Sequence, residues 1–472
     1  MIKTSAIFLF LNYCLGKKVD MSMVVAKIDW RQLYTFASRQ ALLGFCFDGI
    51  ERLTKEFSEE LKQNPMGRDL LMTWLGASQQ IRRQNMKVNV AASKLYSMLR
   101  IDGMRCCILK GQGNALMYPN AYSRNPGDID VWVNASRERI MEYASKKFEL
   151  GDDIRLQHLE ASLDSVPVEL HFFPCSMNNP IYNARLQKWF RRNADLQCSH
   201  IVGLPDGAGD IAIPTTAFNV IYQLTHLYHH FFDEGIGMRQ IIDYFLVVND
   251  FSKNVFLNND LSNHPVNFSN HPVPLSKEGS TFSPSPSSSG SGDVTAPSRC
   301  SEPLRSKDGG PSKVSPDCAG WDRRGVSGDT GSVSCSSASG SSITSVSSAS
   351  TTDSSASTAL VVVQRELKYL GLWKFAGAVM YVLHEVLGLS EDKMIAPMDE
   401  KRGRLLLAEI LDGGNFGRHF TKYGGFTHQS MGKKYFLKIW RNMHFVRYYP
   451  AEALCEPLFR TWHFFWRLKY KK

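Results

Sequence analysis

At 472 residues, the chain is too long for one compact core, and its length indicates two or three folding units. Lysine and arginine outnumber aspartate and glutamate by 55 to 45, and the net charge of +10 attracts phosphates and nucleic acids in general. The 10 cysteines form no Cys-x-x-Cys pair, which argues against a zinc ribbon or a thioredoxin-type site and fits a reducing, cytoplasmic location.

Residues 1–29 contain Lys3 and a short apolar run at 6–11, which weakly resemble a secretory signal. Asn12 interrupts this run, no small-residue cleavage site follows it, and two later methionines offer alternative starts. We therefore interpret residues 1–29 as weakly ordered or as an over-extended start. Elsewhere the chain lacks an uninterrupted apolar stretch of about 18 residues, so we expect a cytoplasmic protein without a membrane partner.

Residues 30–101 carry apolar side chains at three- and four-residue spacing, which predicts amphipathic helices. Within residues 102–200 the period shortens, and apolar or alternating runs predict strands that alternate with one or two helical turns at 114–118 and with a longer helix. The strand runs are 104–109, 127–133, 154–163 and 166–173, the helix is 136–148 with Ser136 as its N-cap, and Asp164-Ser165 forms the last turn. We therefore predict an α+β fold in which helices flank a small mixed β-sheet.

Residues 201–250 return to a helical pattern. Between residues 251 and 358, serine, glycine, proline and aspartate dominate, and this composition predicts a disordered insertion because too little apolar surface is present to offset the entropy cost of ordering. Residues 359–472 are predicted to be helical again. The expected helices are 361–388, 400–411 and 432–469, the last one broken at Pro450, and we interpret the basic tail from Arg441 to Lys472 as a solvated helix face.

The strongest functional signal lies in GDIDVWV, residues 127–133. Side chains two residues apart lie on the same face of a strand, so Asp128 and Asp130 share one face while Ile129 and Val131 face the core. Two like charges on one face repel each other and are costly to desolvate, and a bound divalent cation relieves both costs. The alternative is that this edge of the strand is simply solvated.

A third carboxylate, Glu169, lies in the strand-like segment VPVELHFF, on the face that it shares with His171. If this strand pairs beside GDIDVWV, Glu169 reaches the same cation. Three carboxylates around Mg²⁺ or Mn²⁺ suit phosphoryl transfer, in which catalysis consists mostly of positioning and charge neutralisation.

The run Lys110-Gly111-Gln112-Gly113 lies where a predicted strand gives way to a helix. Glycines at such a position let backbone N–H groups approach a phosphate, and Lys110 and Arg124 would add positive charge. An ordinary strand-to-helix turn would show the same pattern. Its position shortly before the two aspartates favours the phosphate-binding interpretation.

His226 and His230 lie four residues apart in a predicted helix. Three roles stay open for them: packing and hydrogen bonding, metal binding, or lining an acceptor pocket together with His171. Further along the same segment, Arg239 and Asp243 are also four residues apart, and we expect them to form a helix-stabilising ion pair.

The segment LKGQGNALMYPNAYSRNPGDIDVWV resembles the bacterial uncharacterised nucleotidyltransferase family, whose members share an LKG, YP, R and GDIDLLV pattern. The resemblance continues through VELHFF and HLYHHFFDEGIGMRQIIDYF to ILDGGNFGRHF, and so covers most of the chain outside the insertion. It implies a DNA polymerase β-like superfold with Asp128, Asp130 and Glu169 as the metal-binding carboxylates. Gly111 stands where the glycine-serine signature of that superfold begins, and Gln112 replaces its phosphate-contacting serine.

We therefore predict a metal-dependent nucleotidyltransferase that moves a nucleoside monophosphate from an NTP, such as ATP, to an unidentified small-molecule or protein acceptor. One alternative is a non-catalytic nucleotide-binding or regulatory module on the same scaffold. Another is a glycosyltransferase that uses the Asp-x-Asp motif, which would predict a longer parallel sheet upstream. No zinc finger or aromatic-basic motif indicates sequence-specific binding of nucleic acid.

Overall fold

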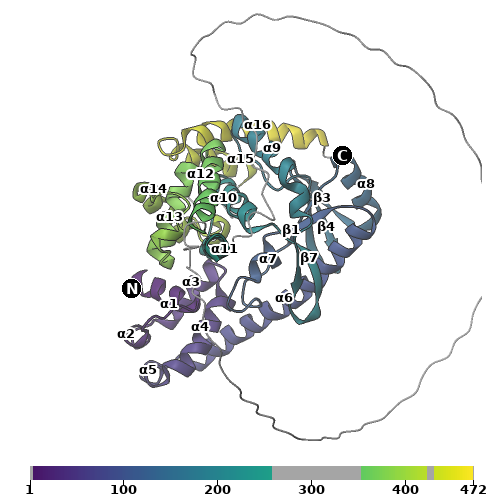
Figure 1. Cartoon of the computed structure of the whole chain (residues 1–472). Coiled ribbons are helices and arrows are strands. Elements are labelled where there is room, and N and C mark those ends of the chain that lie inside the picture. The colour runs from purple at the N-terminus through teal and green to yellow at the C-terminus, as the bar shows by residue number, and fades with distance from the viewer. Residues whose placement is uncertain (1–3, 258–351, 422–429, 471–472) are drawn as a thin grey trace, which may run out of the picture. The chain divides into compact units, whose positions relative to one another are not determined.

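The computed structural model describes residues 4–257, 352–421 and 430–470, which together form a mixed α+β structure, as predicted (Figure 1). Most of the predicted disordered insertion, residues 251–358, lies outside the described residues. Helix α11 (Met238–Leu257) continues past the expected start of the insertion, and α12 (Thr352–Tyr369) begins before its expected end.

The N-terminal segment differs from the weak order that its sequence indicated. Residues Thr4–Cys14 form helix α1, in which Phe10 and Leu11 are buried in the main core. Asn12, which interrupts the apolar run, donates from Nδ2 to the carbonyl oxygens of Phe8 and Val386, each at 2.8 Å. The polar residue therefore fastens α1 to the end of a C-terminal helix.

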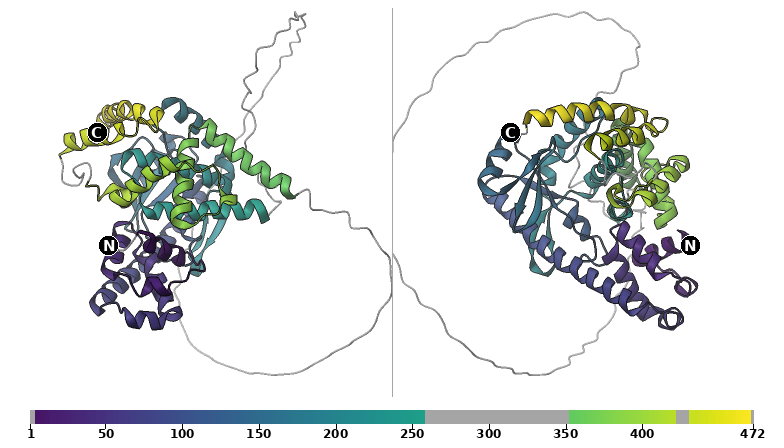
Figure 2. Two further views of the ribbon diagram at one scale, coloured as in Figure 1. Left: turned by 90° about the vertical axis from the view of Figure 1, so that its left-hand side faces the viewer. Right: turned by 180° about the vertical axis from the view of Figure 1, so that it is seen from behind.

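Five further helices precede the first strand. They are α2 (Ser22–Val25), α3 (Trp30–Arg39), α4 (Leu43–Glu56), α5 (Ser58–Gln63) and α6 (Arg68–Ile101). Asp29 caps α3 by accepting hydrogen bonds from the backbone N–H groups of Arg31 and Gln32. The long helix α6 joins these N-terminal helices to the sheet, packing on α4 at one end and on the sheet at the other (Figures 1 and 2).

The main sheet has the strand order β1-β2-β5-β4-β3. Its strands are β1 (Cys106–Leu109), β2 (Ile129–Val133), β3 (Glu149–Ile154), β4 (His158–Leu163) and β5 (Val166–His171). The β2–β5 pair is parallel and the other pairs are antiparallel. The predicted run 154–163 proves to be β4 with the end of β3, a strand whose charged residues concealed it in the sequence.

The two faces of the sheet pack against different helices. Alternate side chains such as Ile129 and Val131 join a core with α6 and α8 (Arg137–Lys147), whose N-cap is Ser136, as predicted. On the opposite face, Trp132 stacks on Phe218 of helix α10 (Thr216–Asp233). The predicted turn at Asp164-Ser165 joins β4 to β5, and both of its residues have positive φ, at 52° and 61°.

Between β5 and α11, the chain adds α9 (Pro180–Gln197), a small sheet of β6 (Ile201–Leu204) and β7 (Gly209–Ala212), and α10. The start of the 201–250 segment is therefore a β-hairpin rather than a helix. The short helix α7 (Gly111–Ala115) follows β1, where the sequence indicated a strand-to-helix turn.

The C-terminal region is helical, as expected. Its remaining helices are α13 (Trp373–Leu387), α14 (Glu400–Gly413), α15 (Met431–Met443) and α16 (Pro450–Tyr470). The predicted helix 361–388 is divided between α12 and α13 at Gly371. Gly371 has a φ of +75°, and a Cβ atom at this position would lie only 2.6 Å from the ring of Tyr182, so no other residue fits without a shift. The predicted break at Pro450 is confirmed, and none of the described helices is long and apolar enough to cross a membrane.

Candidate active site

The register between β2 and β5 brings together the two segments in which the sequence placed carboxylates. The two strands are adjacent, and Asp130 lies directly opposite Glu169. Asp128 precedes β2 by one residue, and all three carboxylates line a single cavity of about 580 Å³. This volume lies within the range of small-molecule and cofactor sites.

The cavity has an acidic wall and a basic wall. Strands β2 and β5 and the residue before β2 supply the acidic wall, and α10 with the residue that follows it supplies three histidines together with Asp233 and Glu234. The basic side is formed by residues from well-separated segments, namely Arg155 after β3, Arg418 after the 3-10 turn η4 (Asn415–Gly417), and Lys434 and Lys438 on α15. A polyanionic ligand with a cation at one end would match this distribution of charge.

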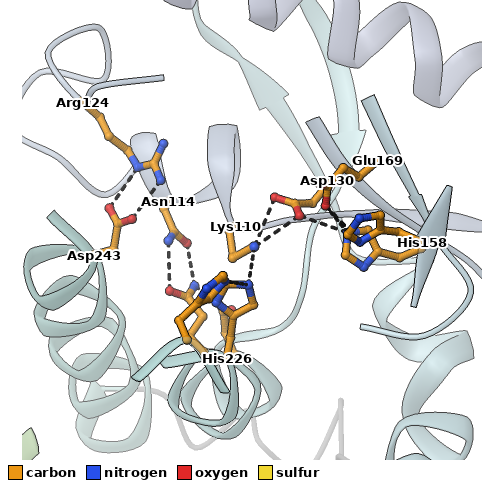
Figure 3. A network of polar contacts seen from close by, with 12 residues as sticks. Lys110, Asn114, Arg124, Asp130, His158, Glu169, His226 and Asp243 are labelled. Carbon is orange, nitrogen blue, oxygen red and sulfur yellow. Dashed lines mark hydrogen bonds and ion pairs between the residues drawn. The ribbon is translucent and has the colours of Figure 1, made fainter. Parts of the chain in front are cut away.

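Lys110 connects the sheet to α10. Its Nζ lies 3.2 Å from each carboxylate oxygen of Asp130 and 2.7 Å from Nε2 of His226 (Figure 3). The backbone of Lys110 has a φ of 51° and a ψ of −125°, a conformation that non-glycine residues rarely adopt. Such strain costs roughly 1–3 kcal/mol and is typical of functional sites.

Two histidines flank Glu169. His171 Nε2 lies 3.0 Å from Asp130 Oδ1 and 3.2 Å from Glu169 Oε2. His158 Nδ1 is also 3.2 Å from Glu169 Oε2, but neither ring nitrogen of His158 has a well-aligned hydrogen-bond partner among the described residues. One possible ligand atom from each of His158, Glu169 and His171 lies within 4.8 Å of those of the other two.

The sequence analysis missed His158, although a signal for it was present. Counting outward along both strands from the turn at Asp164-Ser165 pairs His158 with His171, and the structure shows this pairing. The predicted strand 154–163 included Ile154, which belongs to β3, so the start of β4 at His158 and its pairing with His171 were not recognised.

The ionisation of the three carboxylates depends on their burial, on one another and on the cationic groups beside them. Asp128 is exposed to the cavity but surrounded by protein, and this partial burial together with Asp130 and Glu169 raises its pKa to about 7. Burial would also raise the pKa of Asp130, but Lys110 and a hydrogen bond from His171 hold it below its ordinary value. The same histidine keeps the pKa of Glu169 low against the effect of burial.

The two flanking histidines differ in their charge. Burial alone would lower the pKa of His171, but its hydrogen bonds to Asp130 and Glu169 raise it to about 9. Burial and the proximity of His171 lower the pKa of His158 to about 3, so its ring is neutral, which is the form that binds metals. An imidazolium and a lysine ammonium thus lie between carboxylates that also suit a divalent cation.

The residues predicted to bind phosphate are divided by the structure. Lys110, Gly111 and Arg124 line a smaller cavity of about 70 Å³ beside the three carboxylates. Gln112 is buried and hydrogen-bonded to Asn89 of α6, and Gly113 packs on the side chain of Ile213. The side chain of Gln112 is therefore held in the core.

Arg124 forms a buried, two-pronged ion pair with Asp243 of α11. Its Nε and Nη2 atoms donate to the two carboxylate oxygens at 2.9 and 2.8 Å (Figure 3). The hydroxyl of Tyr118 donates to the first of these oxygens at 2.7 Å. The predicted Arg239–Asp243 pair is wrong, because the guanidinium of Arg124 occupies both oxygens and Arg239 donates to the carbonyl oxygen of Asn125 instead.

The histidines of α10 line the same cavity as the carboxylates. His226 accepts from Lys110, and His230 Nε2 lies 3.2 Å from His226 Nε2. Burial, reinforced by the charge of Lys110, lowers the pKa of His226. Burial and neighbouring charges lower the pKa of His230 to about 3. His171, His226 and His230 therefore line one cavity with the carboxylates, and a role for them in binding the acceptor stays a prediction.

The sequence profile of a family described as "Uncharacterised nucleotidyltransferase" matches residues 26–262, which is half of the 472-residue chain. The chain belongs to this nucleotidyltransferase family. Membership supports a general nucleotidyltransferase-type function with an NTP as substrate. No curated protein and no solved structure matches the chain.

The matched region of the nucleotidyltransferase family contains both sheets and helices α10 and α11, and therefore all three carboxylates. The basic wall is mostly outside it, because Arg418, Lys434 and Lys438 follow residue 262. The candidate site thus combines the region matched by the family, which carries the acidic groups, with the C-terminal helical region, which carries most of the basic groups.

Proposed function

We propose that this chain is an active, metal-dependent nucleotidyltransferase that transfers a nucleoside monophosphate from an NTP to a small-molecule or protein acceptor. The observation that carries this proposal is the register that sets Asp130 opposite Glu169 and leaves Asp128 beside them in one cavity. Transfer forms a bond between an acceptor oxygen and the α-phosphorus and releases pyrophosphate.

The donor set fits a divalent cation such as Mg²⁺ or Mn²⁺. Asp128, Asp130 and Glu169 would hold it, and the neutral ring of His158 offers a nitrogen that Mn²⁺ accepts more readily than Mg²⁺ does. When bound, the cation neutralises phosphate charge and favours the ionised form of an attacking hydroxyl.

The protein groups around the cavity have roles of their own. Lys110 orients the carboxylate of Asp130 from the opposite side to His171. Lys434 and Lys438 of α15 line the same cavity as the carboxylates, with Lys438 3.5 Å from Asp233, and would bind the oxygens of the triphosphate. We therefore assign phosphate binding to Lys110 and this basic wall rather than to the side chain of Gln112.

The alternative functions make different predictions. An Asp-x-Asp glycosyltransferase would have a longer parallel sheet before the motif, whereas the described residues before β1 form helices α1–α6. A non-catalytic module would bind NTP without transferring any part of it, and the test below distinguishes it from an enzyme.

The test is transfer of radioactivity from ATP, GTP, CTP or UTP labelled at the α-phosphate to components of a cell extract, with magnesium or manganese. The Asp128→Asn/Asp130→Asn double variant is compared with Asp195→Asn, which changes an exposed aspartate on α9. Label that appears with wild type and Asp195→Asn but vanishes in the double variant supports the proposal. Cation-dependent NTP binding without transfer would support the non-catalytic module.

A further inference from the structure

Residues 430–472, which include helices α15 and α16, carry most of the net positive charge of the chain. From residue 430 to residue 472 the sequence has ten lysines and arginines but two glutamates, a net +8 out of +10. Both glutamates, Glu452 and Glu456, are buried, each with 1% of its surface exposed. In the described part of α15 and α16, the charge that reaches the surface is therefore entirely basic.

The same two helices also expose large apolar side chains at helical spacing. Three lie on α15 and recur after four and three residues. On α16 a series of five recurs after four, four, three and three residues, and Phe464 is exposed outside this series. All five exposed Phe and Trp side chains of the described residues are on these helices. The side chains with this spacing are Phe436, Trp440 and Met443 on α15, and Leu454, Leu458, Trp462, Phe465 and Leu468 on α16. We call these eight residues the apolar stripe.

The opposite sides of both helices are fastened to the rest of the protein. Arg460 of α16 donates to Asp233 of α10 at 2.8 Å, and Asn442 of α15 donates to the carbonyl oxygen of Phe232 at 2.8 Å. Arg441 of α15 pairs with Glu409 of α14 in the interior. These contacts hold the helices in an orientation that leaves the apolar stripe exposed.

Between α15 and α16 lies a groove of about 440 Å³. Apolar atoms form most of its lining, including those of Phe464 and Leu468, while Lys434, Lys438 and Arg467 place positive charge beside them. The groove thus combines an apolar floor with cationic groups, an arrangement that suits an anionic amphiphile better than it suits water.

We propose that α15 and α16 bind the surface of a membrane that contains anionic lipids. The aromatic side chains of the apolar stripe would insert at the level of the headgroups, and the surrounding lysines and arginines would contact lipid phosphates. The helices lie on the surface and do not span it. This proposal departs from the solvated basic tail without a membrane partner that the sequence analysis expected.

The charge of the surface argues against the other occupants. A second copy would bring one basic face against another, with no exposed acid in the described part of either helix to compensate the repulsion. A nucleic acid would match the charge, but Leu454, Leu458 and Leu468 have no planar group with which to stack on bases. A lipid bilayer accommodates both features at once.

The proposed membrane surface adjoins the candidate active site, because Lys434 and Lys438 line both the groove and the larger cavity. Membrane binding and nucleotidyl transfer are nevertheless independent properties. The test therefore measures binding alone and uses residues that line neither cavity.

The experiment is co-sedimentation of the full chain with vesicles of phosphatidylcholine alone or with a quarter of phosphatidylglycerol. We expect binding to the mixed vesicles, weakened by added salt and accompanied by a blue shift of tryptophan fluorescence. The Trp440→Ser/Phe465→Ser variant should bind at least about tenfold more weakly, because two inserted aromatic side chains are lost.

The control is Met72→Ser/Ile101→Ser, which removes two exposed apolar side chains of α6, where the exposed fractions are 57% and 84%. This variant should bind as wild type does, and circular dichroism should show that both variants are folded. The proposal is overturned if wild type ignores the mixed vesicles or binds both kinds equally. It is also overturned if the control loses binding equally, or if the stripe variant instead abolishes a dimer or nucleic-acid binding.

Discussion

Two clusters of charged groups lie on either side of Lys110, and their contrast separates a structural site from a functional one. In the first, Arg124 satisfies both oxygens of Asp243, and the pair is buried with Tyr118. In the second, Asp128, Asp130 and Glu169 face a cavity in which Lys110 is the only lysine ammonium within 3.2 Å of a described carboxylate of the cluster.

The difference lies in how fully each charge is matched within the protein. A buried pair with every oxygen and hydrogen matched leaves no capacity for a ligand, and breaking it leaves one charge unpaired. When carboxylates beside a cavity outnumber the cationic side chains that contact them, a bound cation can compensate the excess negative charge. The pKa values of such carboxylates are therefore perturbed. The first cluster should therefore respond to mutation in stability, and the second in activity.

The largest effect is expected in the open cluster. Asp130→Asn should lower nucleotidyl transfer by about a thousandfold, because a neutral amide would hold the charge-neutralising cation much more weakly than the carboxylate does. Thermal melting should change little, since the substitution also removes repulsion from Asp128 and Glu169. A large drop in melting temperature with unimpaired transfer would show that Asp130 is structural.

In the closed cluster, Asp243→Ala should reduce the free energy of unfolding by about 3–5 kcal/mol, because it leaves the guanidinium of Arg124 buried without its partner. Urea denaturation measures this loss. The double variant Arg124→Met/Asp243→Leu should recover much of it, since replacing both charges with apolar groups removes the desolvation cost. Equal losses in the single and double variants would contradict a matched pair.

Lys110 lies between the two clusters, and two substitutions separate its charge from its backbone strain. Lys110→Ala and Lys110→Gly should impair transfer equally, because both remove the ammonium beside Asp130. The glycine variant should be more stable than the alanine variant by about 1 kcal/mol, since only glycine adopts a φ of 51° without strain. Thermal melting of the two variants measures this difference, and a less stable glycine variant would rule out strain.

The smallest effect concerns pH. Burial would raise the pKa of Asp243, but the charge and hydrogen bonds of Arg124 hold it below its ordinary value. Its contribution to stability is therefore present above the unfolded pKa of about 3.9 and is lost as the pH falls through the folded pKa. Urea midpoints between neutral pH and about pH 3 should fall less steeply in Asp243→Asn than in wild type. Parallel curves would assign the acid sensitivity to other groups.

Local patterns were sufficient to predict the parts of the site that depend on strand geometry. The two-residue period placed Asp128 and Asp130 on one face of a strand. Glu169 and His171 share a face of another strand, so they approach Asp130 once the two strands are neighbours in the sheet. The fold class followed from the same alternation between helical and strand periods.

The remaining parts depend on contacts between distant segments, for which a single sequence has no signal. Arg124, in the loop before β2, meets Asp243 of α11, and Arg239 looked like the better partner from spacing alone. The lysines of α15 reach the cavity from beyond residue 262, and nothing near Lys434 indicates its destination. Similarly, the outer strand β3 is too charged to show a strand period.

The parallel pairing of β2 with β5 also determines when the site can assemble. Strands β3, β4 and β5 follow one another and pair with their neighbours in the chain, so they can form early. Contact between β2 and β5 must instead close a longer loop, which contains α8, β3 and β4. Until this contact forms, Glu169 does not meet Asp128 and Asp130. We expect an added divalent cation to slow unfolding while leaving the refolding rate almost unchanged.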